Sequence, residues 1–343
     1  MKRFYISLVN GMKDDTFHPL RSEYVQLAGC QSNQETSSDS KKEEAAKVDS
    51  DEDMTSQVKK DGDKYKIALS NSYMSNDWRQ QMERIVEYTA EQEPYKSRCE
   101  LTIVNCENSP EDQPASEESA NHITIDAVKA YKVMAKWLAE AVGGKGNVVL
   151  DQGLPGAAVS EQEYNAAKEI FDSYPDMKVV SDFINNYAEA DGEAALSSVI
   201  AANSDIDVVV TQGYMTSVTN AFKKAGIEDI PASCGGGYNG NLLTCLENDS
   251  QGIIHVYIPG ISAIALNYAI RILDGEEIDK NISIDPAYVA TSNEYDMGEF
   301  SDVRIEVAED GVNCFSDQPD NLQWPVVPSN FGVEIPMDVV LGK

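Results

Sequence analysis

The chain has 343 residues, 42% of them hydrophobic, which is enough for two compact domains. It carries 58 acidic residues against 27 basic ones, a formal net charge of −31 at pH 7. Such a surface repels nucleic-acid phosphates and anionic lipid headgroups, which argues against both as partners and leaves neutral or cationic small molecules open. No stretch approaches the roughly 18 consecutive apolar residues of a membrane-spanning helix.

The first 63 residues differ in composition from the rest. Leu27-Ala28-Gly29-Cys30 resembles the lipobox of bacterial lipoproteins, in which a signal peptide is cut before a cysteine that then carries the lipid. The basic start at residues 1–3 fits a signal peptide, but charged residues within 14–23 interrupt the apolar stretch that should follow. We predict a degenerate signal and lipobox region at 1–30 with lipidation at Cys30, and leave export of this chain open. A disordered acidic tether is predicted at 31–63.

From residue 64 onwards, short apolar runs alternate with amphipathic segments. The apolar runs predict strands at 67–71, 100–105, 122–126, 147–153, 177–183 and 206–213. Helical spacing predicts helices at 77–92, 127–144, 160–175, 189–203 and 216–226. The segments 230–237, 240–248, 252–259 and 262–275 continue the alternation. Glycine closes the helix at 127–144, and Ser160 is expected to cap the start of the helix at 160–175.

Strands separated by helices of this length form right-handed βαβ units and parallel sheets. The predicted fold class is therefore α/β, with doubly wound parallel sheets covered on both faces. Ligands of such sheets bind at the carboxyl ends of the strands, where loops lead into helices. The candidate loops follow residues 71, 126, 153, 213, 237 and 257.

No arrangement of catalytic residues is visible. The chain has no Gly-x-Ser-x-Gly elbow, His-Glu-x-x-His pair or phosphate-binding loop. Residues 235–240 satisfy G-x-G-x-x-G, but the next strand ends without the acidic residue that a dinucleotide site needs. His122 and His255 belong to apolar strands, and Cys234 and Cys245 are expected to be free, buried thiols. We predict no enzyme activity, no cofactor and no metal.

Polar and aromatic residues gather instead where the predicted strands end. Amides, carboxylates and an arginine hydrogen-bond hydroxyl groups, while Trp and Tyr faces cover the apolar side of a sugar ring. For each residue, a role as cap, turn or core residue is the alternative. The predicted ligand-binding residues are Asn71, Tyr73, Asn76, Trp78, Arg79, Glu161, Glu163, Tyr214, Gly237, Tyr238, Asn239 and Tyr257.

Five segments resemble the sugar-binding components of ABC importers of the ribose- and galactose-binding type, in the same order and over most of 64–285. They are 67–82, 137–156, 211–226, 234–241 and 257–278. The resemblance implies a two-lobed type I periplasmic-binding-protein-like fold, in which two α/β lobes joined by a hinge close over one ligand without chemistry. It also implies a monomer with an ABC permease as partner, a location outside the cytoplasm, and membrane attachment only through a lipid anchor.

The chain departs from the ribose-type pattern in its predicted pocket. Glu161 and Glu163 stand where that pattern has arginine, and Gly213 and Tyr214 stand where it has Asn or Asp after Gln212. These differences put a ribose-like pentose in doubt and leave the ligand undetermined.

A larger departure lies at 107–121, where the family has a helix, a strand, a helix and a strand. Roughly 60 residues of the first lobe are absent, which predicts an incomplete lobe and a sheet with few strands. We assign the truncated first lobe to 64–126 and 256–285 and the second lobe to 127–255. Residues 286–343 are assigned to a hinge return and a C-terminal wrap.

The predicted function is capture of a sugar or similar small polar molecule outside the cytoplasm and its delivery to an ABC importer. One alternative is a degenerate family member or mis-assembled gene product that binds nothing. Another is a sugar-responsive transcriptional regulator, which would need a basic helix-turn-helix ahead of residue 64, where the acidic tether stands.

Overall fold

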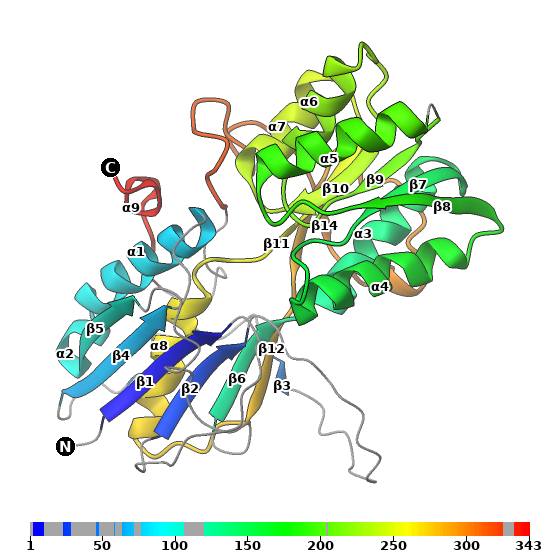
Figure 1. Ribbon diagram of the computed structural model, residues 1–343. Helices are drawn as coiled ribbons and strands as arrows, with labels where there is room; N and C mark the ends of the chain where they lie inside the picture. The colour runs from blue at the N-terminus through cyan, green and yellow to red at the C-terminus, as the bar shows by residue number, and fades with distance from the viewer. Residues whose placement is uncertain are drawn as a thin grey trace, which may run out of the picture. The chain divides into compact units, whose positions relative to one another are not determined.

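The computed structural model describes residues 3–9, 23–28, 46–47, 58, 64–71, 77–105, 120–203, 205–324 and 333–343. These residues form two α/β units (Figure 1). Unit 1 comprises the described residues up to Ile125, those within 258–285 and those from 333 onwards. Unit 2 comprises those within 126–257 and 286–324.

Unit 2 is built on a seven-stranded sheet with the order β14-β13-β11-β10-β9-β7-β8. All neighbouring strands are parallel except β11 and β13. The strands are β7 (Lys145–Asp151), β8 (Asp176–Phe183), β9 (Val208–Val210), β10 (Ala232–Gly236), β11 (Gly252–Val256), β13 (Ala287–Ala290) and β14 (Ile305–Val307).

Helices cover both faces of this sheet. They are α3 (Ala127–Ala141), α4 (Ala158–Asp172), α5 (Glu189–Ala202), α6 (Thr216–Lys224) and α7 (Asn239–Glu247). Val148 and Leu150 pack in one core with residues of α3 and α4, whereas Val149 packs in a second core with residues of α5 and α6. Because successive side chains of a strand point to opposite faces, the uninterrupted run VVL fills both cores.

Unit 1 has a seven-stranded parallel sheet with the order β3-β12-β6-β2-β1-β4-β5. The strands are β1 (Arg3–Val9), β2 (Glu23–Ala28), β3 (Ala46–Lys47), β4 (Tyr65–Asn71), β5 (Cys99–Asn105), β6 (Ala120–Ile125) and β12 (Asn281–Ile284). Its helices are α1 (Asp77–Glu91), α2 (Tyr95–Arg98), α8 (Ile261–Leu273) and α9 (Met337–Leu341).

The expectation of a sheet with few strands in unit 1 is wrong. β1 and β2 come from the segment predicted as a signal and lipobox region, and they lie side by side between β4 and β6. β1 pairs with β4 along its length, and β2 pairs with β6. The chain between β5 and β6 is as short as the sequence indicated, but strands from the N-terminal segment occupy the middle of the sheet. Figure 1 shows them as the two blue arrows.

β4 and β12 of unit 1 alternate in burial, unlike the central strands β9 and β11 of unit 2, which are buried throughout. Ile67 and Leu69 on β4 are fully buried, whereas Lys66 on β4 and Glu100 on β5 are exposed and form an ion pair with an N–O distance of 3.6 Å. Alternation of this kind is typical of a sheet with one apolar and one polar face. α1 and α8 pack against each other and against strands of this sheet.

A buried polar cluster ties distant parts of unit 1 together. The Arg98 guanidinium, with its side chain 1% exposed, forms an ion pair with Asp274 at the end of α8. Tyr65 on β4 donates its hydroxyl to the same carboxylate oxygen at 2.7 Å. Three segments separated by up to 209 residues therefore meet at one carboxylate.

The predicted helices and strands of 64–275 are confirmed as to type and order. The prediction that Ser160 caps the start of α4 is wrong. The helix begins at Ala158, and the Ser160 hydroxyl accepts instead from the backbone N–H of Leu154 at 3.1 Å. The glycine end of α3 is confirmed: Gly143 and Gly144 have positive φ values, and the Gly144 N–H donates to the Ala139 carbonyl.

Candidate functional site

The carboxyl-terminal edge of the unit 2 sheet is organised around Asp151, the last residue of β7. Its side chain is 1% exposed. Oδ1 accepts hydrogen bonds from the backbone N–H groups of Gly153 at 2.8 Å and Asn185 at 3.3 Å, and Oδ2 accepts from that of Gln212 at 2.9 Å. A single carboxylate therefore binds the loops that follow β7, β8 and β9.

Two carboxyl groups lie in this buried region. Burial raises the pKa of Asp151 to about 7, while the three backbone N–H groups act in the opposite direction because they stabilise the ionised form. Glu163 on α4 is 7% exposed, and its pKa is raised well above the ordinary value, first by burial and then by the charge of Asp151. In the described part of the chain no lysine or arginine forms an ion pair with either group. Burial without a paired cation therefore favours the uncharged form of both carboxyl groups.

The side chain of Gln212 fixes the start of α4 against the sheet. Its amide nitrogen donates to the carbonyls of Asp151 at 3.1 Å and Ser160 at 2.8 Å. The Ser160 hydroxyl in turn lies 2.5 Å from the Tyr187 hydroxyl. Gly153 has φ +65°, and a Cβ there would lie 1.9 Å from Gln212 Oε1. Only glycine fits this position.

A second amide side chain joins the loops after β9 and β10. Asn241 donates to the carbonyls of Gly213 at 2.7 Å and Gly236 at 2.8 Å, and it accepts from the Met215 N–H at 2.7 Å. On these loops the rings of Tyr214 and Tyr238 stack, with centroids 4.6 Å apart and planes 17° apart. Their hydroxyl oxygens are 3.3 Å apart.

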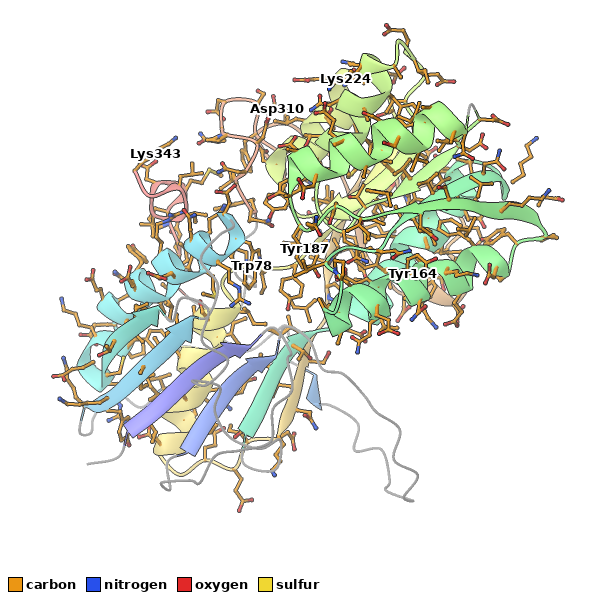
Figure 2. The ribbon with its side chains drawn as sticks, in the orientation of Figure 1. Trp78, Tyr164, Tyr187, Lys224, Asp310 and Lys343 are labelled. Carbon is orange, nitrogen blue, oxygen red and sulfur yellow. The ribbon has the colours of Figure 1, made fainter. Side chains whose placement is uncertain are left out.

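Aromatic side chains at this edge remain partly accessible. Tyr187, Tyr214 and Tyr257 follow β8, β9 and β11, and each is half-buried. Figure 2 labels Tyr187 on the loop after β8. Exposed Gln152 follows β7. Phenol faces and hydroxyls beside an amide suit a small polar molecule with hydroxyl groups and an apolar ring face.

The other predicted residues of unit 2 differ in accessibility. Glu161 is exposed on α4, whereas Gly237 and Tyr238 are buried, and a Cβ on Gly237 would lie 3.1 Å from Val256 Cα. Asn239 is 5% exposed. Its amide nitrogen donates to the carbonyls of Phe315, Gln318 and Pro319, and its oxygen accepts from the Phe315 N–H. Asn239 therefore holds residues 315–319 on this unit.

In unit 1, three predicted residues fall within the described chain. Asn71 is the last residue of β4, and Trp78 and Arg79 form the first turn of α1. The Arg79 guanidinium carbon lies 5.6 Å from the centre of the Trp78 ring. Arg79 is 5% exposed. Tyr73, Asn76 and the predicted lipidation site Cys30 lie outside the described residues.

Sequence reasoning missed Asp151, Asn185 and Tyr187. The strand at 177–183 was predicted, but the loop after it was not included among the candidate loops. The positional rule for parallel strands would have found Asn185 and Tyr187, because both follow that strand directly. Asp151 carried a weaker signal: it is a lone acidic residue at the end of a run that is otherwise apolar.

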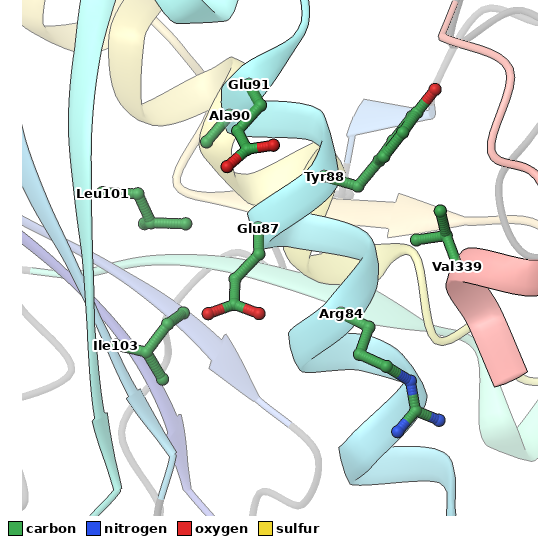
Figure 3. Close-up of a pocket in the computed structure, with 8 residues that line it drawn as sticks. All are labelled: Arg84, Glu87, Tyr88, Ala90, Glu91, Leu101, Ile103 and Val339. Atoms are coloured by element: carbon green, nitrogen blue, oxygen red, sulfur yellow. The ribbon is translucent and has the colours of Figure 1, made fainter. Parts of the chain in front are cut away.

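A separate open groove of about 680 Å³ lies in unit 1 (Figure 3). It runs along the second half of α1 beside the edge strand β5 and α9. Arg84 donates to the Val340 carbonyl of α9 at 2.6 Å and 2.9 Å. Burial and the charges of Glu83 and Glu91 raise the pKa of Glu87. Because α1 begins near the carboxyl end of β4, its second half lies away from the strand ends where ligands of such sheets bind.

The described residues contain no helix long and apolar enough to cross a membrane. The four cysteines within them, Cys99, Cys234, Cys245 and Cys314, are free and buried, as predicted for Cys234 and Cys245.

Several solved structures resemble this fold. A solute-binding protein of an ABC transporter from Actinobacillus succinogenes with bound D-allose is 21% identical, with a TM-score of 0.55, and covers 65% of this chain and 96% of its own. One from Thermobispora bispora is 22% identical, with a TM-score of 0.56 and coverages of 65% and 84%. The arabinose-binding component from Shewanella sp. is 13% identical, with a TM-score of 0.57 and coverages of 64% and 90%.

No curated protein sequence matches the chain. A model of the periplasmic binding protein domain matches residues 104–277, which are 174 of the 343 residues. The α/β architecture, with parallel strands whose carboxyl ends carry the candidate site, agrees with this match. The chain therefore belongs to the periplasmic binding protein family, whose members bind solutes rather than catalyse reactions.

Proposed function

We propose that this protein captures a sugar or similar small polar molecule outside the cytoplasm and delivers it to an ABC importer. The observation that carries the proposal is the edge of the unit 2 sheet, where half-buried Tyr187, Tyr214 and Tyr257 follow parallel strands. A buried network of Asp151, Gln212 and Asn241 fixes the loops that bear Tyr187 and Tyr214. Prearranged aromatic faces reduce the entropy lost on binding.

The ligand class rests on the chemistry of this edge and on its relatives. The side chains offer phenol hydroxyls and amides, which hydrogen-bond ligand hydroxyls in pairs. The names of similar solved structures mention D-allose, L-arabinofuranose and D-arabinose. Neutral monosaccharides are therefore the first ligands to test, with an amino sugar as a charged comparison.

The direct test is a thermal melt of the full chain with D-allose, D-arabinose, L-arabinose, D-galactose and D-glucosamine. A ligand that binds only the native state stabilises it by RT ln(1 + [L]/Kd), about 2.7 kcal/mol at 100 times Kd, and so raises the melting temperature. We expect one sugar to produce a saturable rise. Replacing Tyr214 with alanine should reduce this rise, whereas Tyr164→Phe, on the outside of α4 where the hydroxyl bonds Asp182, should not.

A melt that none of these sugars or related polyols moves would favour the alternative of a family member without binding activity. Equal rises in the wild type and in Tyr214→Ala would instead place the ligand away from the unit 2 edge.

We also propose that Cys30 carries a lipid anchor, and this has a consequence for the sheet of unit 1. Cleavage in front of Cys30 would remove β1 and β2 from the sheet of unit 1. A lipidated chain and a chain that keeps both strands are therefore different molecules. Intact mass of the protein from bacterial membranes tests this: acylated protein beginning at Cys30 supports the anchor, and an unacylated chain that retains residues 1–28 refutes it.

A further inference from the structure

Three loops of unit 2 share one buried anion, the carboxylate of Asp151. The Asp151 carboxylate accepts one backbone hydrogen bond from each of the loops after β7, β8 and β9, at 2.8, 3.3 and 2.9 Å. Each donor precedes a feature of the candidate site: Gly153 leads to the start of α4, Asn185 stands two residues before Tyr187, and Gln212 stands two residues before Tyr214.

Other hydrogen bonds also join these loops: the Gln212 amide donates to the carbonyls of Asp151 and Ser160, and the Asn186 N–H donates to the Gly153 carbonyl at 3.1 Å, but the Asp151 carboxylate is the group that binds all three loops at once. Asn185 adds a side-chain hydrogen bond of 3.4 Å to the Gln212 carbonyl, and its own oxygen accepts from the Tyr187 N–H at 2.8 Å. Asn186 and Tyr187 both have positive φ values, 52° and 55°. A left-handed conformation at two successive non-glycine residues is unfavourable on its own and persists only where the surroundings hold it.

We propose that Asp151 is the positioning residue of the candidate ligand site. Its ionised carboxylate holds the three loops in a common arrangement, so that Tyr187 and Tyr214 are presented correctly to a ligand. Asp151 itself does not contact the ligand, because it is 1% exposed and both of its carboxylate oxygens accept from backbone N–H groups. The proposal rests on the proposed function only in assuming that this edge binds a ligand. The arrangement of the loops can be tested without any ligand.

The titratable groups around Asp151 determine how its positioning role depends on pH. The groups that interact electrostatically with Asp151 are Glu163 on α4, Tyr131 on α3 and Cys234 on β10. Burial raises the pKa of Tyr131 and of Cys234, so both stay neutral below pH 9. His255 on β11 packs edge-on against Tyr131, with ring centroids 5.4 Å apart, and burial lowers its pKa to about 4, so it stays neutral above pH 5.

Between pH 5 and pH 9 the groups left to titrate are therefore Asp151 and Glu163. Protonation of Asp151 replaces an acceptor with an O–H group and leaves at least one of the three N–H groups without its partner. The three hydrogen bonds lower the pKa of Asp151 whereas burial raises it, so with Asp151 still buried the loops should hold this arrangement above pH 7 and loosen below it. Resistance of the whole unit to unfolding has the opposite pH dependence, because the net pKa is raised.

The first experiment follows the backbone amides of Gly153, Asn185 and Gln212 by NMR in the full-length wild type between pH 5 and 9. We expect all three to shift with one shared midpoint near pH 7. The midpoint should disappear in Asp151→Asn and persist in Glu163→Gln and in Asp182→Asn, a matched loss of charge at an exposed position of β8. Separate midpoints, or a shared midpoint that vanishes only in Glu163→Gln, would overturn the proposal.

The second experiment uses whichever panel sugar raises the melting temperature. Asp151→Asn should weaken its affinity by about tenfold at pH 8, the equivalent of one net hydrogen bond. Wild-type affinity should fall from pH 8 to pH 5.5, whereas the affinity of Asp151→Asn should stay nearly constant. Asp151→Glu, which keeps the charge, should recover part of the pH dependence. An unchanged affinity and pH profile in Asp151→Asn would refute the positioning role.

The two proposals fail separately. If no sugar binds, the proposed function fails, while the amide titration of the wild type, Asp151→Asn and Glu163→Gln still decides whether Asp151 holds the three loops, because it requires no ligand. If a sugar binds but the amides do not titrate together, the function stands and the role of Asp151 is wrong.

Discussion

The two units of this protein achieve the same fold class by different means. In unit 2, β7 to β11 and their helices follow one another in the chain, and apolar runs such as Val148–Leu150 fill cores on both faces. In unit 1, the sheet is assembled from segments between Arg3 and Ile284, and the buried Arg98–Asp274 pair joins parts far apart in sequence. Neighbouring segments thus determine unit 2, whereas unit 1 depends on pairing at long range.

The largest expected effect comes from removing β1 and β2. Deleting residues 1–28 leaves β4–β5 and β6–β12 without the two strands that join them. We expect backbone amides of β4, β5 and β6 to lose protection in hydrogen exchange, while those of β7, β9 and β10 keep theirs. Deleting residues 333–343, which removes only α9 from unit 1, is the control. Protection of β4 and β6 that survives the deletion of 1–28 would mean that these strands do not need β1 and β2.

The next largest effect is expected at the buried ion pair of unit 1. Arg98→Met leaves the Asp274 carboxylate, 8% exposed, without its cation, which costs about 3–5 kcal/mol of unfolding free energy. Denaturant unfolding measures the loss. Lys66→Met, which breaks the exposed pair with Glu100, should cost less than about 1 kcal/mol. Similar losses in both variants would show that the buried cluster is not a tie between distant segments.

Replacing Asn239 tests whether a buried polar contact between distant segments also stabilises unit 2. Alanine at this position leaves the Phe315 N–H and three carbonyls without a buried partner, so we expect a loss of about 2–3 kcal/mol. Sugar affinity should change little. The control is Asn313→Ala, which removes hydrogen bonds at an exposed site. A large loss of affinity with unchanged stability would make Asn239 a ligand contact, as the sequence first indicated.

The smallest effect concerns Glu163 and the acidity of unit 2. Because its pKa is raised in the native state, the native protein holds a proton that the unfolded chain releases above about pH 4.3, so stability falls as pH rises. Glu163→Gln removes this dependence, and we expect the melting temperature at pH 8 to rise by roughly 2–4 °C, with little change at pH 4.5. Exposed Glu161→Gln should show no such difference. A variant that is less stable at pH 8 would mean that the ionised Glu163 has a favourable partner.

Patterns within single segments made most of the fold predictable. The strands and helices from 64 to 275 follow from apolar runs and helical spacing, because each is buried against its neighbours in the chain. The strands β1 and β2 were not predicted, although FYISLV is apolar enough for a strand. Their partners β4 and β6 lie tens of residues away, and no local signal specifies such a pairing.

The candidate site was predictable in position and less so in chemistry. The carboxyl ends of parallel strands indicated the loops that bear Tyr214 and Tyr257. The sequence could not tell that the Asn239 amide is occupied by residues 315–319, nor that Asp151 binds three loops, since both depend on contacts between residues 34 to 80 positions apart. Burial also separated Glu161 from Glu163, two residues apart on one helix.

The position of β1 and β2 bears on how the polypeptide matures while it is being synthesised. Both strands are made before the elements that cover them. β6, which pairs with β2, begins about 90 residues after β2 ends, and α8 (Ile261–Leu273), which packs against β1 and β2, begins about 230 residues after it. The two strands can therefore pair with β4 and β6 early, but they stay without the cover of α8 while residues 126–257 of unit 2 are made. We expect translation to be the stage at which this protein most needs a chaperone, and the need to centre on its first thirty residues.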